Sequence, residues 1–222
     1  MKQISLIFPI LFTLAFSKIN AQAVSVGVTA GFNFQNINGK SADGNDLKNQ
    51  LVPRYALGLT VPISLTPEYV IQPGVLFTTK GAKSQDGATN TNSTYIEVPV
   101  NFIYKPQLMG GSVLLGFGPY VGIGLGGNEK TDKSGVSLER SIKYKSSINA
   151  IDLLNTSEVY YKPIDAGVNL LAGYEFSNGF SFQVNAQLGL TNINPDINGS
   201  TTDKTALKNT GFGISLGYRI RK

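Results

Sequence analysis

A strict alternation of apolar and polar residues between residues 164 and 191 restricts the possible folds more than any other feature of the chain. Every second residue of 164–176 is apolar, polar residues or glycine lie between them, and only Leu171 breaks the pattern. The alternation resumes over residues 180–191 after a Ser-Asn-Gly sequence at 177–179, residue types that suit a tight hairpin turn. A period of two predicts strands with one apolar and one polar face.

The length of these strands points to a membrane. Thirteen residues at ~3.3 Å each, tilted by ~45°, rise about 30 Å, which is the thickness of the hydrocarbon layer of a bilayer. Strands of globular proteins are about half as long. We therefore expect the even-numbered residues of 164–176 to contact lipid, and Asn169 and Gln183 to face a closed, filled interior.

The same alternation recurs along the chain and predicts eight strands. They cover residues 24–34, 55–65, 69–77, 96–104, 113–123, 164–176, 180–191 and 212–220. Their connections are alternately long and short, so both ends of the mature chain fall on the side of the short turns. This pattern is typical of outer-membrane barrels, whose sheet closes because lipid offers no partner for a free edge. The predicted fold class is all-β, an eight-stranded antiparallel up-and-down transmembrane β-barrel.

Aromatic residues gather at the ends of the predicted strands, where amphipathic rings favour a lipid–water boundary. On the short-turn side they are Tyr69, Tyr104, Tyr174, Phe176, Phe180 and Tyr218, and on the other side Phe32, Phe34, Tyr55 and Phe77. We expect these residues to form two girdles.

The first residues have the pattern of a secretory signal peptide. A charged start at Lys2 precedes an apolar run over residues 4–16 and a small-residue cleavage site at 21–23. We predict a signal peptide over residues 1–21 and a single barrel domain over residues 22–222, and cleavage after Ala23 remains an alternative.

Composition argues against catalysis and against nucleic-acid binding. The chain contains neither cysteine nor histidine, which removes disulfides, thiol chemistry, the usual general base and the usual metal ligand. Without Lys2 and Lys18 of the signal, the net charge falls from +5 to +3, and no basic cluster is interleaved with aromatic residues. We predict no catalytic residues, no cofactor, no metal and no nucleic-acid partner.

Two other architectures are compatible with parts of the pattern. Residues 106–128 are uncharged, but their eight glycines and two prolines are unfavourable in a helix by ~1 and ~3 kcal/mol each. A soluble, lipocalin-like barrel would place the apolar face inside. The polar face, however, is rich in Gly, Ser, Asn and Gln rather than Lys and Glu, which favours an interior over a solvated outer surface.

Charged residues on the polar faces are candidates for an interior site. Towards the long loops they are Arg54, Lys80, Glu97 and Asp165, and towards the short turns Glu175, Arg219 and Arg221. An eight-stranded barrel has room only for side chains, so opposite charges are expected to pair. They form either a structural plug or a gate on a narrow conducting path, and we favour the plug.

Two short motifs and four prolines carry weaker predictions. The glycines of 122–127 match a dinucleotide-binding pattern, but no helix follows, so we interpret them as space-saving in a crowded interior. Residues 194–199 place oxygen ligands as a calcium loop does, yet Thr205 stands where a bidentate Glu is needed, and an ordinary polar loop is favoured, as for Asp43, Asn45 and Asp46. Prolines within the predicted strands are expected at bulges or local bends, and they are Pro62, Pro73, Pro99 and Pro119.

The long segment that starts at Gly126 and ends at Tyr161 is the best candidate for partner binding. Apolar residues lie in it among balanced charges, and they include Val136, Leu138, Ile142, Tyr144, Ile148, Ile151, Leu153 and Leu154. It forms either a protruding hairpin or cap that packs on itself, or a contact surface for a partner, since loops on rigid scaffolds often carry recognition.

Several segments occur in the order in which similar ones occur in a known family. They are residues 71–77 (IQPGVLF), 80–83 (KGAK), 95–100 (YIEVPV), 104–106 (YKP), 116–122 (GFGPYVG), 172–176 (AGYEF) and 216–218 (LGY). In these segments the chain resembles the PorT family of outer-membrane β-barrel proteins from Bacteroidetes-type bacteria. The resemblance implies an eight-stranded outer-membrane barrel that tolerates its prolines, and no activity, although one namesake is linked to protein secretion. The chain departs from the family by ending in Arg221 and Lys222 rather than in an aromatic residue.

We therefore predict a small, monomeric, non-enzymatic barrel in the cell outer membrane, surrounded by outer-membrane lipid. It would be a structural or interaction protein with a filled lumen, acting through its extracellular loops or with an envelope or secretion machine. The alternative is a narrow pore for small solutes, which eight strands disfavour. A lipid hydrolase or acyltransferase is disfavoured by the missing histidine.

Overall fold

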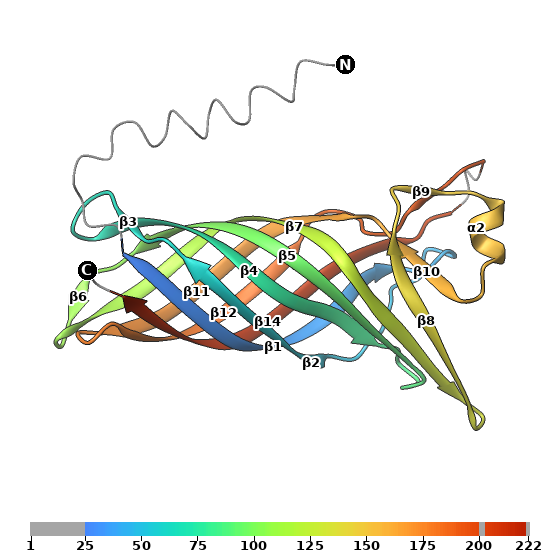
Figure 1. Ribbon diagram of the computed structural model, residues 1–222, viewed down its shortest axis with the longest axis horizontal. Helices are drawn as coiled ribbons and strands as arrows, with labels where there is room; N and C mark the ends of the chain where they lie inside the picture. Colours follow the sequence, from blue (N-terminus) through green and yellow to red (C-terminus); the bar gives the residue numbers. More distant parts are fainter. Residues whose placement is uncertain (1–24, 200–202, 221–222) are drawn as a thin grey trace, which may run out of the picture.

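Eight long strands form a closed antiparallel ring in the computed structural model, which describes residues 25–199 and 203–220 (Figure 1). In ring order the strands are β1 (Val26–Lys40), β2 (Val52–Thr60), β4 (Tyr69–Lys83), β5 (Thr89–Tyr104), β7 (Gly111–Lys133), β11 (Ile164–Phe176), β12 (Phe180–Gly189) and β14 (Ala206–Ile220). The ring closes where β1 pairs with β14, from Val26 opposite Ile220 to Lys40 opposite Ala206. The predicted fold class is confirmed. The predicted signal peptide lies outside the described residues.

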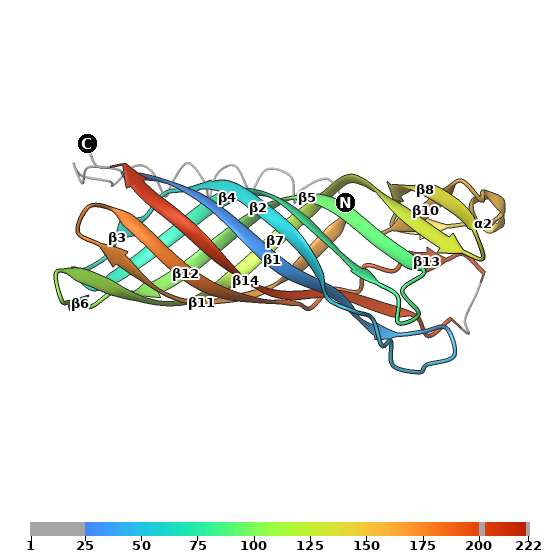
Figure 2. The same cartoon turned by 90° about the horizontal axis from the view of Figure 1, so that it is seen from below.

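Short elements occupy the two ends of the ring (Figures 1 and 2). At the short-turn end are β3 (Ile63–Ser64) and β6 (Gln107–Leu108). At the opposite end are β8 (Val136–Tyr144), β9 (Ser147–Ile148), α2 (Ala150–Leu154), β10 (Glu158–Tyr161) and β13 (Asp196–Ile197). The N-terminal end of β1 and the C-terminal end of β14 both lie at the short-turn end, as expected. Among the described residues, no helix is long and apolar enough to cross a membrane.

Apolar side chains cover the outside of the ring and polar side chains line its inside. Phe32 is 69 % exposed and Leu216 64 %, whereas Asn169 and Gln183 line an interior cavity. The alternative of a soluble barrel with an apolar interior is therefore wrong. Leu171, the exception in the alternation, packs inside against a small apolar cluster formed by Val70, Ile103 and Leu114.

Several strands are longer than the alternation predicted. The predicted strands covered residues 24–34, 113–123 and 212–220, but β1 continues to Lys40, β7 continues to Lys133 and β14 begins at Ala206. The physical reason is that backbone pairing does not need an apolar face. Beyond the lipid, the ladder continues with polar residues on both faces.

We expected bulges or local bends at the prolines, and the register shows no bulge there. The register shift between β5 and β7 lies between Thr94 and Tyr95 instead. At the prolines the pairing is interrupted without a shift: β2 ends two residues before Pro62, and the β5–β7 ladder skips two residues after Pro99. Where proline lacks an N–H group, the ladder therefore loses residue pairs, and neither strand gains the extra residue of a bulge.

Aromatic residues of the predicted short-turn girdle contact one another on the barrel surface. Near the short turns Tyr69 lies 5.2 Å from Tyr104 and Phe180 lies 4.9 Å from Tyr218, measured between ring centroids. Towards the long loops, Phe34 is 44 % exposed and Tyr55 53 %.

Candidate functional site

Three charged side chains meet in the interior and form what we call the buried ion cluster. Lys80 extends from β4, Glu97 from β5 and Asp165 from β11. The Lys80 Nζ lies 2.5 Å from Glu97 Oε2 and 2.8 Å from Asp165 Oδ2, and none of the three side chains is more than 3 % exposed. The pairing of these opposite charges, expected from the alternation alone, is confirmed.

Neutral donors from three further strands complete the buried ion cluster. The Asn209 amide donates to Asp165 Oδ2 at 3.0 Å, and the Tyr120 hydroxyl donates to Asp165 Oδ1 at 3.3 Å. The Gln187 amide donates to Glu97 Oε1 at 3.0 Å. The cluster thus ties β4, β5, β7, β11, β12 and β14 together across the lumen. Such an arrangement stabilises buried charge and fills the barrel at this level.

Arg54 does not join the buried ion cluster, contrary to the expectation that the interior charges pair. Its guanidinium donates to the Thr91 carbonyl at 2.7 Å and to Asn90 Oδ1 at 3.0 Å. The physical reason is that β5 begins as early as Thr89 at the long-loop end. Its polar residues 89–95 offer oxygen acceptors to Arg54, which lies near the start of β2.

A second group of charges, the short-turn ion cluster, lies at the other end of the lumen. Glu175 accepts from Lys105 Nζ at 2.8 Å through Oε2 and pairs with Arg219 through Oε1. The pairing of Glu175 with Arg219 was expected, and Arg221 lies outside the described residues. Lys105 was missed because its position just after a predicted strand suggested an exposed turn.

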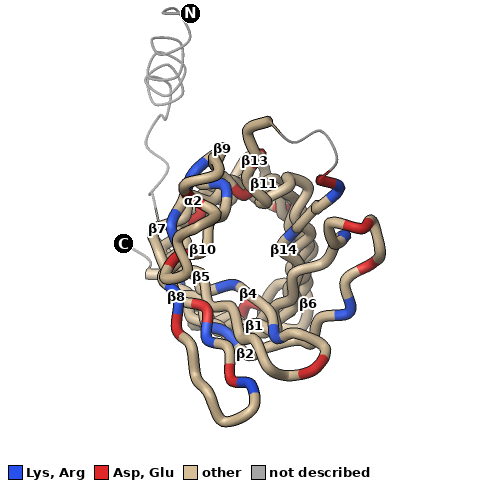
Figure 3. The backbone as a smooth tube through the Cα atoms, turned by 90° about the vertical axis from the view of Figure 1, so that its right-hand side faces the viewer, with Lys and Arg blue, Asp and Glu red and all other residues tan. Residues whose placement is uncertain are grey.

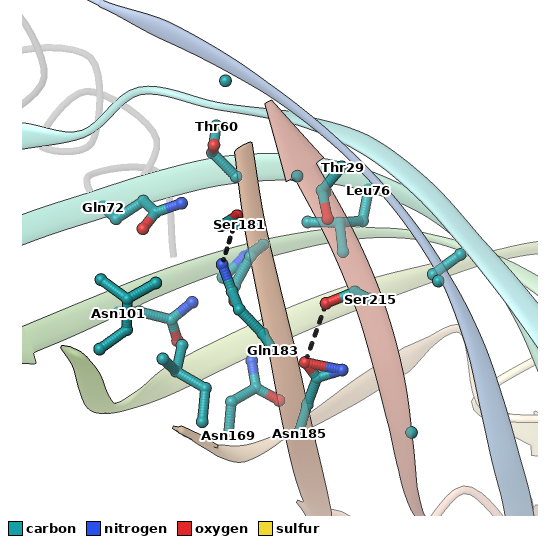
Figure 4. A pocket seen from close by; sticks show the side chains of 18 of the residues that line it. Thr29, Thr60, Gln72, Leu76, Asn101, Asn169, Ser181, Gln183, Asn185 and Ser215 are labelled. Carbon is teal, nitrogen blue, oxygen red and sulfur yellow. Dashed lines mark hydrogen bonds between the residues drawn. The ribbon is translucent and has the colours of Figure 1, made fainter. Parts of the chain in front are cut away.

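A cavity of about 150 Å³ lies between the two ion clusters (Figure 4). Its lining includes eight carboxamide side chains, namely Asn33, Gln35, Gln72, Asn101, Asn169, Gln183, Asn185 and Gln187. We had expected a filled interior, but the cavity shows that the interior is filled only in part. The buried ion cluster fills the lumen towards the long loops. Between it and the short-turn ion cluster, small residues such as Ser215 and Gly213 leave the cavity open.

The two weak motifs have structural roles in this fold. A side chain at Gly124 would overlap the ring of Tyr144, so the glycine saves space, as predicted. In the candidate calcium loop, Asp196 pairs with Lys162 at 2.8 Å and Asn194 donates to Asp203 at 3.3 Å. Within the described residues, no group of three acidic side chains is positioned to hold a metal ion.

Residues 126–161 form a protruding ribbon, which we call the long-loop extension. The end of β7 pairs with β8, and β10 pairs in parallel with β8. Glu129 is buried at its base, where it pairs with Arg140 and accepts from the Thr91 hydroxyl at 3.1 Å. Burial raises the pKa of the neighbouring Tyr161 hydroxyl, which stays protonated. The segment protrudes and pairs with itself, as the first of the two alternatives expected, and its Ile142 and Tyr161 also pack against Ile193 outside the segment.

Three apolar side chains of α2 are exposed, and we call them the apolar tip. They are Ile151, Leu153 and Leu154, with Leu154 80 % and Ile151 77 % exposed, and Val136 and Leu138 are also exposed, near the turn between β7 and β8. Seen from this end of the molecule, charged residues of both signs are scattered over the surrounding loops (Figure 3).

The comparison with protein families agrees with the geometry. The family model described as "Outer membrane protein beta-barrel domain" matches residues 6–194. The attachment invasion locus protein Ail of Yersinia pestis is 13 % identical, with 90 % of this chain and 100 % of that chain covered and a TM-score of 0.42. Neisserial surface protein A is 9 % identical, with 90 % and 99 % covered and a TM-score of 0.44. The N-terminal β-barrel domain of Pseudomonas aeruginosa OprF is 12 % identical, with 90 % and 100 % covered and a TM-score of 0.37. No match was found among curated protein sequences.

Proposed function

Because this chain belongs to the outer membrane protein beta-barrel domain family, we propose that it serves in the outer membrane as a structural and interaction protein that binds a partner through its long-loop extension. The observation that carries the proposal is the apolar tip. Exposed apolar side chains that lie together on one short helix are a common mark of an interaction site. Loops held on a rigid scaffold are suited to recognition.

The orientation of the barrel supports a partner outside the cell or in the outer envelope. In barrels of this kind short turns face the periplasm and long loops face outwards. The apolar tip belongs to the longest connection, between β7 and β11, and so would face outwards. We further propose that the chain is a monomer related to the PorT family, on the strength of the segments at 71–77, 95–100 and 116–122.

An experiment in intact envelopes tests the interaction. The variant Ile151→Ser/Leu153→Ser/Leu154→Ser removes the exposed apolar side chains of α2, and chemical cross-linking then reports the proteins in contact with the barrel. We expect a cross-linked partner to be lost from this variant. The control variant Leu108→Ser/Met109→Ser removes exposed apolar side chains at the short-turn end and should retain the partner. Equal cross-linking in both variants would contradict the proposal.

The alternative function is a narrow pore, and the buried ion cluster argues against it. Lys80 and Asp165 are fully buried in the lumen, where they leave no open path at their level. Purified protein in planar bilayers is therefore expected to give no steady current. Steady open-channel currents would favour the pore over the interaction protein.

A further inference from the structure

We propose that the cavity between the two ion clusters is a binding site for a small, uncharged polyhydroxy molecule of about the size of glycerol, reached from the short-turn end. The cavity is lined by inward-facing residues of all eight long strands. The proposal is independent of the apolar tip and its partner.

One wall of the cavity carries two buried hydrogen-bond acceptors without a partner. Asn33 and Gln35 on β1, Gln72 on β4 and Asn101 on β5 line it. The Gln35 Oε1 and Asn101 Oδ1 atoms are buried and have no hydrogen-bond partner, and Gln35 is only 3 % exposed. A buried acceptor without a donor is destabilising by ~1–3 kcal/mol. These two carbonyl groups therefore favour an occupant that donates hydrogen bonds.

The opposite wall is already ordered by bonds among its own side chains (Figure 4). Ser215 donates to Asn185 at 3.2 Å, and the Gln187 amide donates to Asn169 Oδ1 at 3.0 Å. Gln183 donates to Ser181 at 3.5 Å. The side chains that are free to bind a ligand therefore lie on the wall formed by β1, β4 and β5.

The electrostatics of the cavity select an uncharged occupant. Its charged lining residues lie at the two ends, where Glu97 shares Lys80 with Asp165 and Glu175 pairs with both Lys105 and Arg219. An ion placed between them would lose its hydration, and the charges at both ends are already engaged with one another. Carboxamides offer both donors and acceptors, and hydroxyl groups complement both.

The shape of the lining selects a compact carbon skeleton. The apolar cluster around Ile103, with Val70, Leu114 and Leu171, lies on the cavity surface and can contact C–H groups. A volume of about 150 Å³ leaves room for a molecule of several non-hydrogen atoms. A three-carbon polyol has this combination of apolar skeleton, hydroxyl groups and size.

Access follows from the position of the buried ion cluster. The lining extends to Gly27, Thr60 and Arg219 at the strand ends of the short-turn side. At the other end Lys80 and Asp165 are fully buried and separate the cavity from the long loops. The ligand would therefore enter past the short-turn ion cluster.

Saturation-transfer NMR on the purified barrel, in a detergent without a sugar head group, tests the site. The probes are glycerol and its charged analogue glycerol 3-phosphate. We expect saturation transfer to glycerol and none to glycerol 3-phosphate. Gln35→Leu, which removes an unpaired amide at similar volume, should weaken glycerol binding by about tenfold, the equivalent of one or two hydrogen bonds.

Two more variants separate binding from misfolding. Ser215→Leu fills the cavity and should abolish the signal, whereas Gln107→Leu changes an exposed glutamine and should leave it unchanged. Circular dichroism confirms that each variant retains its strands, and only folded variants are compared. The proposal is overturned if glycerol gives no signal, if Gln35→Leu and Ser215→Leu bind as the native barrel does, or if glycerol 3-phosphate binds equally well.

Discussion

At the residue scale, the central feature is one ammonium group that two carboxylates share inside the barrel. Lys80 has no exposed surface, and it is held between Glu97 and Asp165. Two carboxylates and one ammonium leave a residual negative charge, which the donors of Tyr120 and Asn209 help to stabilise. Removal of one partner from such a group is far more destabilising than removal of a surface ion pair.

Replacement of Lys80 by Met tests this balance. The variant leaves Glu97 and Asp165 buried without a cation, so we expect a loss of ~3–5 kcal/mol in the free energy of unfolding. Urea titration of the barrel in lipid vesicles, followed by circular dichroism, measures it. Lys143→Met, at an exposed position on β8, is the control and should change stability by less than ~0.5 kcal/mol. Equal stability of the two variants would show that the buried charges do not depend on Lys80.

Glycine permits close approach of two strands beside the interrupted β5–β7 ladder. A Cβ atom at Gly118 would overlap the Val100 carbonyl, which is rigid backbone. We expect Gly118→Ala to lower the free energy of unfolding by at least ~1–3 kcal/mol, as overpacking does. Gly126→Ala is the matched control, since a Cβ there meets nothing within 4 Å. The same urea titration compares them, and a neutral Gly118→Ala would contradict the packing.

At the element scale, the long-loop extension is held together by polar contacts of its own. The short helix α2 begins with a capping box in which Asn149 accepts from the Asp152 N–H and Asp152 accepts from the Asn149 N–H. Asp152 also pairs with Lys145 at 2.5 Å. These bonds position Ile151, Leu153 and Leu154, so the geometry of the apolar tip depends on one carboxylate.

Acidification should therefore loosen α2. The hydrogen bond from Lys145 and the Asn149 N–H hold the pKa of Asp152 below its ordinary value. A lowered pKa means that the contribution to stability is complete above the unfolded value of ~3.9 and is lost as the pH falls through the folded value. We expect the amide resonances of Ile151 and Asp152 to move towards random-coil positions below pH ~4. In Asp152→Asn these shifts should not depend on pH, and persistence of the dependence would contradict the assignment.

At the scale of the whole molecule, ring closure places functions at opposite ends. The ring joins β1 to β14, so both termini of the barrel lie at the short-turn end, and the long-loop extension projects from the other (Figure 1). The two compartments that the ends face differ in chemistry and accessibility, and the orientation decides which of them the apolar tip contacts.

Cysteine labelling in intact cells tests the orientation, because the chain has no cysteine of its own. Leu154→Cys lies at the apolar tip, and Met109→Cys lies in a short turn where the side chain is 93 % exposed. With a membrane-impermeant maleimide we expect labelling of Leu154→Cys only, and labelling of both after the cells are lysed. Labelling of Met109→Cys alone in intact cells would reverse the orientation.

The sequence was sufficient to predict which side chains face the lumen and which face outwards. It was not sufficient to predict which side chains contact one another across the lumen, beyond the general pairing of opposite charges. Asn169 and Gln183 face inwards and Ile164 and Leu170 outwards, as the alternation required, because the period of a strand is a local property. The same phase would have placed Tyr120 inside, since it lies between the outward-facing Pro119 and Val121. The strands were predicted too short wherever their outward face stopped being apolar.

The amino-acid sequence by itself determined that this is a barrel with an apolar exterior and polar lumen, since the alternation and the turns are encoded locally. Only the tertiary structure decided which charges meet, because contacts such as Lys80 with Asp165 depend on the stagger of strands far apart in the chain. The same stagger set the buried ion cluster at one level and left an amide-lined cavity at another. It also let β7 run on past the lipid, pair with β8 and raise the apolar tip above the ring.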